Sequence, residues 1–362
     1  MSGQVRVGVV GSGGWADLLH LPALKSHPRA EVAAICSRTP AHAEAMASKY
    51  AIPQVFTDYR DMIEHGNLQA LVVVTPDALH YPITMDALDA GLHVLCEKAL
   101  ALNVYQAKAM YERAEAVGVK HMVLFTSRWL PPYQYLRQLI DEGYIGRWLH
   151  CQLSYVGEYG RRPGYAWRFD RQQGNGILGD LGSHLIDLAR WYVGDIARVS
   201  AHLQTFVDRP GPDGEVLHPA NDSAMLLLEF VNGAQGMIHA TAVAHVRGRG
   251  QDQHFALYGE GGTLEFDLVD GNVALHGAQQ DEERFQRLEI PDELWGDVDL
   301  SRSYIPRINE FFVKQPAADR AFIDAIIEDR PASPNFYDGY KVQEVIDAAI
   351  AAHEQGCWIS LA

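Results

Sequence analysis

Short apolar runs alternate with helix-like patterns over the first 125 residues of the chain. The runs lack polar alternation, which is typical of strands buried on both faces of a sheet, and they cover residues 5–10, 32–37, 70–75, 93–96 and 119–125. Between them, apolar residues recur at helical spacing over residues 41–50, 83–90 and 104–117. This alternation predicts right-handed β-α-β units, and hence an N-terminal α/β domain of residues 1–125 with a parallel, doubly wound sheet.

The pattern changes after residue 125. Helical patterns cover residues 131–142, 179–193, 316–328 and 338–354, and strand-like runs cover 148–156, 200–207, 223–230, 234–245, 254–259 and 262–267. The dipeptides Asn232-Gly233 and Asp270-Gly271 are typical hairpin turns. We therefore expect residues 126–362 to form an α+β domain on a large, mostly antiparallel sheet.

Two of these strands, 223–230 and 234–245, have apolar residues that point to both faces of the sheet. Helices are expected to cover one face, and a monomer would leave the other exposed to water. The pattern therefore predicts an open-faced sheet covered by a second copy of the chain, in a homodimer or homotetramer.

Composition narrows the class of protein. The 362 residues are 48% apolar and 21% charged, as in a soluble globular protein of about two domains. The net charge of −16 argues against nucleic acid or an anionic membrane as a partner, and no apolar run approaches the 18 residues of a membrane span. The N-terminus lacks a signal-peptide pattern, and the cysteines Cys36, Cys96, Cys151 and Cys357 are widely spaced. We therefore expect reduced thiols and a cytoplasmic location.

A glycine-rich turn follows the first predicted strand and reads Gly-Ser-Gly-Gly-Trp-Ala. Gly11 permits the tight turn, Gly13 lets the backbone approach a pyrophosphate, and Ala16 allows the next helix to pack closely on the sheet. The N-terminus of that helix faces the anion. Because the turn lies between a strand and a helix, it predicts a dinucleotide site that also includes Gly14 and Trp15.

The end of the second predicted strand indicates which dinucleotide is bound. An NAD site usually has an acidic residue there, about 20 residues after the glycines, on the ribose hydroxyls. Here the strand end has no acid and contains Ser37 and Arg38. The hydroxyl can donate to a 2′-phosphate, and the guanidinium can pair with it bidentately. The sequence therefore favours NADP, with NAD as the alternative.

Chemistry-bearing residues follow the next two strands of the predicted sheet. Thr75 and Pro76 end one strand, with His80 soon after, and Glu97 and Lys98 end the other. Ligands of doubly wound sheets bind beyond these carboxyl ends. The Lys98 ammonium could there stabilise a substrate oxyanion or exchange a proton.

A polar stripe interrupts the apolar helix predicted over residues 179–193. Asp180, His184 and Asp187 lie at positions i, i+4 and i+7, which share one face. A histidine flanked by carboxylates suits acid–base catalysis near neutral pH. Metal ligation and a purely structural hydrogen-bond network are the alternatives, and we expect no metal because hydride transfer to a nicotinamide needs none.

Together these motifs resemble the glucose–fructose oxidoreductase / inositol dehydrogenase / rhizopine catabolism (Gfo/Idh/MocA) family over essentially the whole chain. The resemblance rests on the glycine turn with His-Leu-Pro-Ala at 20–23, Thr-Pro-Asp at 75–77 with His80, Ala-Gly-Leu-His-Val-Leu-Cys-Glu-Lys at 90–98, the 180–187 motif, and the tail at 333–339. It implies a Rossmann domain, followed by a domain whose open-faced sheet often makes subunit contacts. It also implies NAD(P)-dependent oxidation or reduction of sugars, inositols, dihydrodiols or related polyols.

The resemblance also implies roles for single residues. Lys98, Asp180 and His184 correspond to the catalytic residues, Trp167-Arg168 to a pair near the cofactor, and Arg128 to an arginine near the active site. Two positions depart from the family pattern. Asp77 replaces an asparagine, and Ala99 replaces a proline that commonly follows a cis bond. Because a cis bond before alanine costs about 3 kcal/mol, we expect a different backbone path for Lys98.

The sequence thus predicts an NADP-preferring oxidoreductase that acts on a carbohydrate-like alcohol or ketone. His184 would exchange the hydroxyl proton, Lys98 would stabilise the oxyanion, and Asp180 would orient one of them, with Arg128 also contacting the substrate. We expect Lys98 and His184 to converge in a cleft between the domains. The alternatives are a glycosidase that acts by transient oxidation and elimination with NAD, and an NADP-sensing regulatory protein without turnover.

Overall fold

The computed structural model describes residues 3–212 and 217–361 of the chain. By internal contacts the chain divides into two compact units, one of residues 1–125 with 295–340 and the other of residues 126–294 with 341–362. The sequence analysis had assigned all residues after 125 to the second domain. Segment 295–340 belongs instead to the first unit, because its helices α8 (Tyr304–Lys314) and α9 (Asp319–Ile327) pack against α1 (Leu21–Ser26) of that unit.

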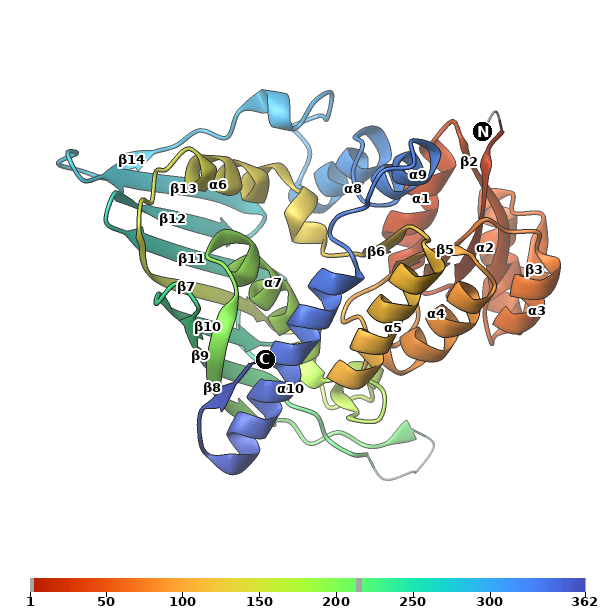
Figure 1. Ribbon diagram of the computed structural model, residues 1–362, viewed down its shortest axis with the longest axis horizontal. Coiled ribbons are helices and arrows are strands. Elements are labelled where there is room, and N and C mark those ends of the chain that lie inside the picture. Colours follow the sequence, from red (N-terminus) through yellow and green to blue (C-terminus); the bar gives the residue numbers. More distant parts are fainter. Residues whose placement is uncertain (1–2, 213–216, 362) are drawn as a thin grey trace. The chain divides into compact units, whose positions relative to one another are not determined.

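The first unit contains a six-stranded parallel sheet of strand order β3-β2-β1-β4-β5-β6 (Figure 1), which confirms the doubly wound α/β prediction. Its strands are β1 (Val5–Val10), β2 (Ala30–Cys36), β3 (Gln54–Phe56), β4 (Ala70–Val73), β5 (His93–Cys96) and β6 (His121–Val123). All four residues of β4 are buried, as expected for a central strand covered on both faces. The strand order reverses between β1 and β4, and this is where such sheets bind ligands.

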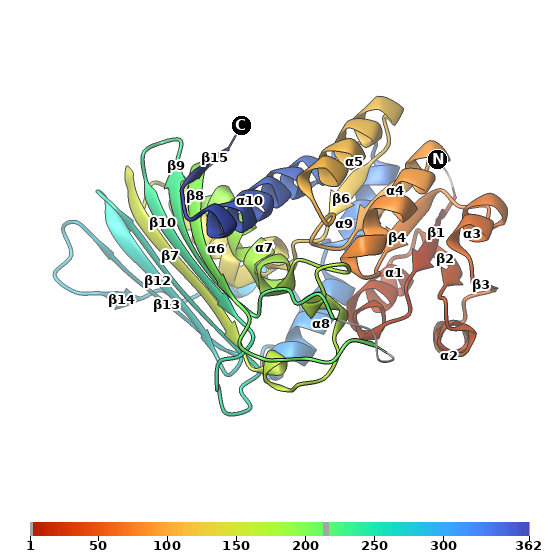
Figure 2. The same ribbon diagram turned by 90° about the horizontal axis from the view of Figure 1, so that it is seen from below.

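Helices connect these strands. They are α1, α2 (Pro40–Tyr50), α3 (Tyr59–His65), α4 (His80–Asp89) and α5 (Val104–Val117), with a π-helical turn (Ala16–His20) before α1 and a 3₁₀ turn (Asp77–Leu79) before α4. Helices α4 and α5 lie side by side in both views (Figures 1 and 2). Asn103 caps the start of α5 by accepting from the Gln106 amide, and Gly118 ends it in a left-handed conformation.

The second unit contains a nine-stranded sheet of order β14-β13-β12-β11-β7-β10-β9-β8-β15. The strands are β7 (Trp148–Gly157), β8 (Ile196–Gln204), β9 (Ser223–Phe230), β10 (Gln235–Thr241), β11 (Gln251–Gly259), β12 (Gly262–Val269), β13 (Asn272–Gln279), β14 (Gln286–Arg287) and β15 (Ile359–Ser360). Neighbouring strands are antiparallel except β7 and β10, which are parallel. The prediction of a large, mostly antiparallel sheet is therefore confirmed.

Helices cover one face of this sheet. Figure 2 shows α6 (Pro131–Asp141) and α7 (Ser183–Tyr192) on that face, and no helix of the described residues on the other face. Strand β12 alternates strictly between buried and partly exposed residues, the pattern of a sheet with one covered face. On the covered face, Tyr133 of α6 packs on Phe255 and Phe266 with ring centroids 6.1 and 5.2 Å away.

Several elements escaped the sequence analysis. Strands β3, β13, β14 and β15 and helices α3 and α8 were not predicted, while α9 and α10 (Phe336–Gln355) were predicted with shifted ends. The helix predicted over 179–193 consists of a π-helical turn (Leu178–Gly182) followed by α7. The peptide bond between Lys98 and Ala99 is cis, so the different backbone path expected for Lys98 is not observed. Among the described residues, no helix is both long and apolar enough to cross a membrane.

Candidate active site

The glycine-rich turn lies at the carboxyl end of β1, next to β4. Gly11 has a φ of +118°, and a Cβ there would lie 2.1 Å from the Val74 carbonyl oxygen, so only glycine fits. A Cβ on Gly13 or Gly14 would meet no described atom within 4 Å. The turn is therefore tight on the side of the sheet and open on the other side, as a backbone cradle for a pyrophosphate requires.

The end of β2 is joined to this turn by side chains. The Ser12 hydroxyl donates to the Ser37 hydroxyl at 2.8 Å, so the glycine turn and the predicted ribose site are adjacent. Arg38 is exposed and forms no ion pair with the described part of the chain. Its guanidinium is thus available to an anionic ligand.

The end of β4 presents a polar group without a partner. The Thr75 hydroxyl oxygen is buried and has no hydrogen-bond partner among the residues described. The side chain of His80, by contrast, is fully buried, with its ring nitrogens 2.8 Å from the Thr75 and Ala99 carbonyl oxygens. Burial lowers the pKa of His80 below its usual value, because it outweighs the hydrogen bonds to the two carbonyl oxygens, which would raise the pKa. The ring therefore holds together the chain after β4 and the chain after β5, while a contact of His80 with the cofactor stays a prediction.

Glu97 and Lys98 end β5. Lys98 is half-buried, whereas Glu97 is buried and accepts from the Trp15 indole at 2.8 Å. Burial would raise the pKa of Glu97, but the His20 hydrogen bond and the charges of His20 and Lys98 hold it below its usual value. Glu97 is thus an anionic anchor for Trp15, whose side chain remains 42% exposed at the start of the first helix.

The residues of the polar stripe predicted over 180–187 lie on two consecutive elements. Asp180 lies on the π-helical turn, and its carboxylate accepts from the Tyr159 hydroxyl at 2.6 Å and pairs with Arg168 at 2.9 Å. His184 and Asp187 lie on α7, which follows the turn. Asp180, Tyr159 and Arg168 together form a polar cluster.

Tyr159 is a site residue that the sequence analysis missed. It lies in a 3₁₀ turn (Tyr159–Arg161) directly after β7, so its position beyond a strand end was the available signal. Burial and the Asp180 charge raise the pKa of Tyr159 well above its usual value, which keeps the hydroxyl protonated as a donor. In the same cluster, the Arg168 guanidinium lies 4.8 Å from the centre of the Trp167 ring.

Asp187 and Arg128 form a buried bidentate ion pair. The Arg128 Nε and Nη2 groups donate to the two carboxylate oxygens at 2.8 and 2.6 Å. Both residues are buried, and the guanidinium also lies 5.6 Å from the centre of the Trp191 ring. Arg128 thus fixes α7, the helix that positions the buried ring of His184. Substrate contact by Arg128 stays a prediction.

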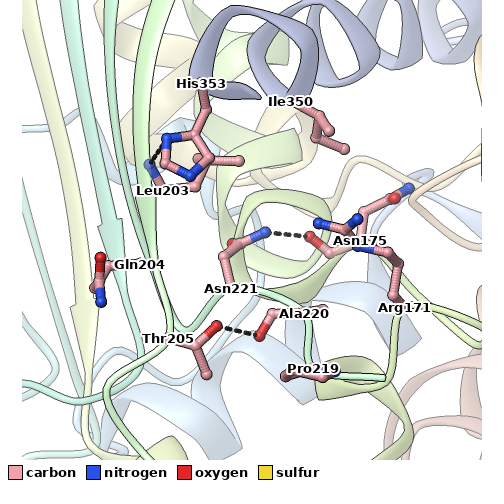
Figure 3. A pocket seen from close by; sticks show the side chains of 10 residues that line it. All are labelled: Arg171, Asn175, Leu203, Gln204, Thr205, Pro219, Ala220, Asn221, Ile350 and His353. Carbon is pink, nitrogen blue, oxygen red and sulfur yellow. Dashed lines mark hydrogen bonds between the residues drawn. The ribbon is translucent and has the colours of Figure 1, made fainter. Parts of the chain in front are cut away.

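The turn before Asp180 is held by Asn221. Gly176 has a φ of +66°, and a Cβ there would lie 2.3 Å from the Asn221 carbonyl oxygen. The Asn221 side chain accepts from the Leu178 amide at 2.9 Å and donates to the Asn175 carbonyl at 3.0 Å. Figure 3 shows these asparagines in the wall of a cavity of about 290 Å³ in the second unit. The cavity therefore borders the support of the Asp180 turn.

These residues fit a nicotinamide dinucleotide. The open cradle at Gly13 and Gly14 would hold its pyrophosphate. The Thr75 hydroxyl, which has no hydrogen-bond partner among the described residues, would hold its nicotinamide end, and the Arg38 cation would hold its ribose end. No group of three or more histidine, cysteine, aspartate or glutamate side chains in the described ranges could hold a metal ion.

Comparison with known proteins decides the family. Residues 5–125 match the model described as an oxidoreductase family with an NAD-binding Rossmann fold, and residues 133–265 match the GFO/IDH/MocA C-terminal domain. Levoglucosan dehydrogenase of Pseudarthrobacter phenanthrenivorans is 30% identical over 360 residues, which cover 90% of this chain and 88% of that protein. The chain belongs to the GFO/IDH/MocA family of oxidoreductases.

A further relative and a solved structure support the same assignment to the GFO/IDH/MocA family. D-glucoside 3-dehydrogenase of Escherichia coli K12 is 28% identical over 255 residues, 68% of this chain and 72% of that protein. A solved structure of levoglucosan dehydrogenase in complex with NADH and levoglucosan superposes with a TM-score of 0.87 at 28% identity, covering 99% of both chains. The predictions of family, fold and NAD(P)-dependent dehydrogenase class are therefore confirmed.

Proposed function

We propose that this protein is an NADP-preferring dehydrogenase that interconverts a secondary hydroxyl and a ketone on a cyclic sugar or related polyol. Support comes from the Asp180 cluster, where an anionic acceptor stands beside the Tyr159 and Arg168 donors, four residues before His184. Neutral polyols offer a donor and an acceptor on every hydroxyl, so such a mixed cluster is complementary to them. Similarity to a levoglucosan and a D-glucoside dehydrogenase supports the same substrate class.

The bound nicotinamide supplies an acceptor for the substrate hydride, and the chain supplies the remaining groups. In the oxidative direction His184 accepts the hydroxyl proton, while Lys98 stabilises the oxygen as it becomes an oxyanion. Asp180 orients the substrate together with Tyr159. Reduction of a ketone uses the same groups, with His184 returning the proton.

Turnover tests this function directly. We expect the purified protein to reduce NADP⁺ in the presence of neutral cyclic sugars, levoglucosan among them, with absorbance of the reduced nicotinamide as the readout. A protein that binds NADPH but turns over no sugar, inositol or their ketones would contradict the proposal.

Cofactor preference depends on Arg38. We expect NADPH to bind at least tenfold more tightly than NADH, about 1.4 kcal/mol, because the exposed Arg38 guanidinium, which has no ion-pair partner in residues 3–212 and 217–361, can pair with the 2′-phosphate. Arg38→Ala should remove most of this difference and leave the affinity for NADH nearly unchanged. Fluorescence titration of both nucleotides measures it.

Arg60→Ala is the control for that experiment, because this surface arginine is paired with Asp86. It should leave both affinities unchanged. Equal affinity of the wild-type protein for the two nucleotides, or a preference for NADH, would overturn the assignment of NADP.

We also propose that the open sheet face is a contact between copies of the chain. Met225, Leu227 and Met237 are 53%, 52% and 42% exposed, and Leu227 is directly paired with Met237 across β9 and β10. Contiguous apolar residues of this kind mark an interface. The cytoplasmic location expected from the sequence stays a prediction.

Light scattering tests the oligomer. We expect a particle of two or four times 40.2 kDa at micromolar concentration, and dissociation when Leu227→Glu places a charge in the apolar patch. Val231→Glu is the matched control, since Val231 is 72% exposed but lies beyond the end of β9. A monomeric wild-type protein would refute this arrangement.

A further inference from the structure

A buried chain of ionisable side chains joins α9 to the strand end that bears Lys98. Asp319, the first residue of α9, has its Oδ1 atom 2.9 Å from His20 Nδ1. His20 Nε2 lies 3.1 Å from Glu97 Oε1. All three residues are buried, and although Asp319 lies 299 positions after His20 in the sequence, both segments belong to the first unit.

The charges of this chain follow from its geometry. Each ring nitrogen of His20 faces a carboxylate oxygen, and only an imidazolium can donate from both nitrogens. Burial lowers the pKa of His20, but the charges of Asp319 and Glu97 and their hydrogen bonds outweigh it and raise the pKa to about 10. At neutral pH His20 is therefore a buried cation between the side chains of Asp319 and Glu97.

The chain ends at two groups of the cofactor site. Glu97 Oε1, the atom facing His20, also accepts from the Trp15 indole, and Glu97 Oε2 accepts from the Lys98 amide at 3.1 Å. Trp15 stands at the glycine-rich turn, and Lys98 is the proposed oxyanion-stabilising residue. The orientation of both groups depends on a Glu97 carboxylate that stays ionised and fixed.

We propose that Asp319 and His20 are positioning residues of the cofactor site, which act through Glu97 to hold Trp15 and the Lys98 backbone in place. Neither residue need touch the cofactor. With Asp319 removed, His20 loses one of its two anionic partners and Glu97 loses its fixed cation. A rotated Glu97 no longer accepts from Trp15, and a protonated Glu97 accepts more weakly than a carboxylate, so the anchor at the rim of the dinucleotide cradle is weakened. This inference rests on the nicotinamide cofactor of the proposed function, but not on its substrate.

The chain offers a matched control on the same helix. Asp324, five residues after Asp319 on α9, pairs with the buried His27 at 3.0 Å. This pair also joins α9 to the region of α1, but it has no contact with Glu97. Asp319→Asn and Asp324→Asn therefore each remove one Asp–His pair, and only the first disturbs the chain to Trp15.

The experiment measures NADPH and NADH affinity by titration, together with the Trp15 indole N–H signal in ¹H–¹⁵N spectra, assigned with Trp15→Phe. We expect Asp319→Asn to weaken binding of both nucleotides about tenfold and to shift the Trp15 signal. Asp324→Asn should change affinity less than twofold and leave that signal in place. The His20 ring should titrate at lower pH in Asp319→Asn than in the wild-type protein.

Equal effects of the two variants, or an unchanged Trp15 signal in Asp319→Asn, would reduce Asp319 to a structural role and overturn the inference. Should Asp319→Asn fail to fold, His20→Gln with the same measurements decides the question. Because the readouts are binding and spectra, a wild-type protein that turns over no sugar would refute the proposed function while leaving this result intact.

Discussion

Lys98→Ala and His184→Ala should each lower kcat by about 10²–10⁴, the usual contribution of a positioned acid–base or oxyanion-stabilising group. Lys98 lies at the carboxyl end of β5 beside the anchored Glu97, and His184 lies in the first turn of α7. Neither residue belongs to the open cradle of the glycine turn. Affinity for NADPH should therefore change little, so the loss appears in kcat rather than in cofactor binding. Steady-state kinetics with a separate NADPH titration measure both quantities.

Two surface variants control for nonspecific effects. Lys108→Ala and His42→Ala remove exposed side chains of the same types on α5 and α2 and should leave kcat unchanged. If Lys98 and His184 act on the same hydroxyl, the double variant should lose less than the product of the two single losses. A loss smaller than tenfold in both single variants would contradict their catalytic assignment.

Arg128→Ala should destabilise the protein by about 3–5 kcal/mol, the cost of leaving one member of a buried ion pair without its partner. Arg128 donates two guanidinium hydrogen bonds to Asp187, which is fully buried. The variant leaves that carboxylate in a low-dielectric interior with its bidentate partner gone. Urea-induced unfolding, followed by circular dichroism, measures the loss.

The control separates the buried charge from the lost contact. Arg128→Met combined with Asp187→Leu removes both charges and should recover most of the stability, because an apolar pair of similar volume avoids the desolvation penalty. Arg113→Ala breaks a pair with Asp89 in which both members are exposed, and it should cost no more than about 1 kcal/mol. If Arg128→Ala costs as little as Arg113→Ala, the buried pair does not hold α7.

The local signals of the chain determined the first sheet and its glycine turn. Short uninterrupted apolar runs such as β4 indicate strands covered on both faces, because helices on either side of a parallel sheet bury every consecutive side chain of a central strand. Gly11 and Gly13 were identifiable because a tight strand-to-helix turn that admits a ligand allows no larger side chain. The same reasoning predicted β9 with the bounds that the structure has, Ser223–Phe230, and the open apolar face around Leu227.

The tertiary structure decided which partners the polar side chains have. Asp180, His184 and Asp187 form a single stripe by helical spacing, and the structure supplies the partners: Tyr159 and Arg168 for Asp180, and Arg128 for Asp187. Periodicity fixes only the direction in which a side chain leaves its own helix. The residue that meets it comes from another segment, and no local pattern specifies that segment.

Asp319 shows the same limit over a longer range. It lies 299 positions after His20, in a segment that the sequence analysis had assigned to the other domain, yet the two side chains are 2.9 Å apart. What the sequence by itself determined were most of the strands, the glycine turn and the residue types at strand ends, because these depend on neighbours within a few positions. Ion pairs between distant segments depend on how whole elements pack, since an unpaired buried charge is tolerated only where the fold brings its partner to it.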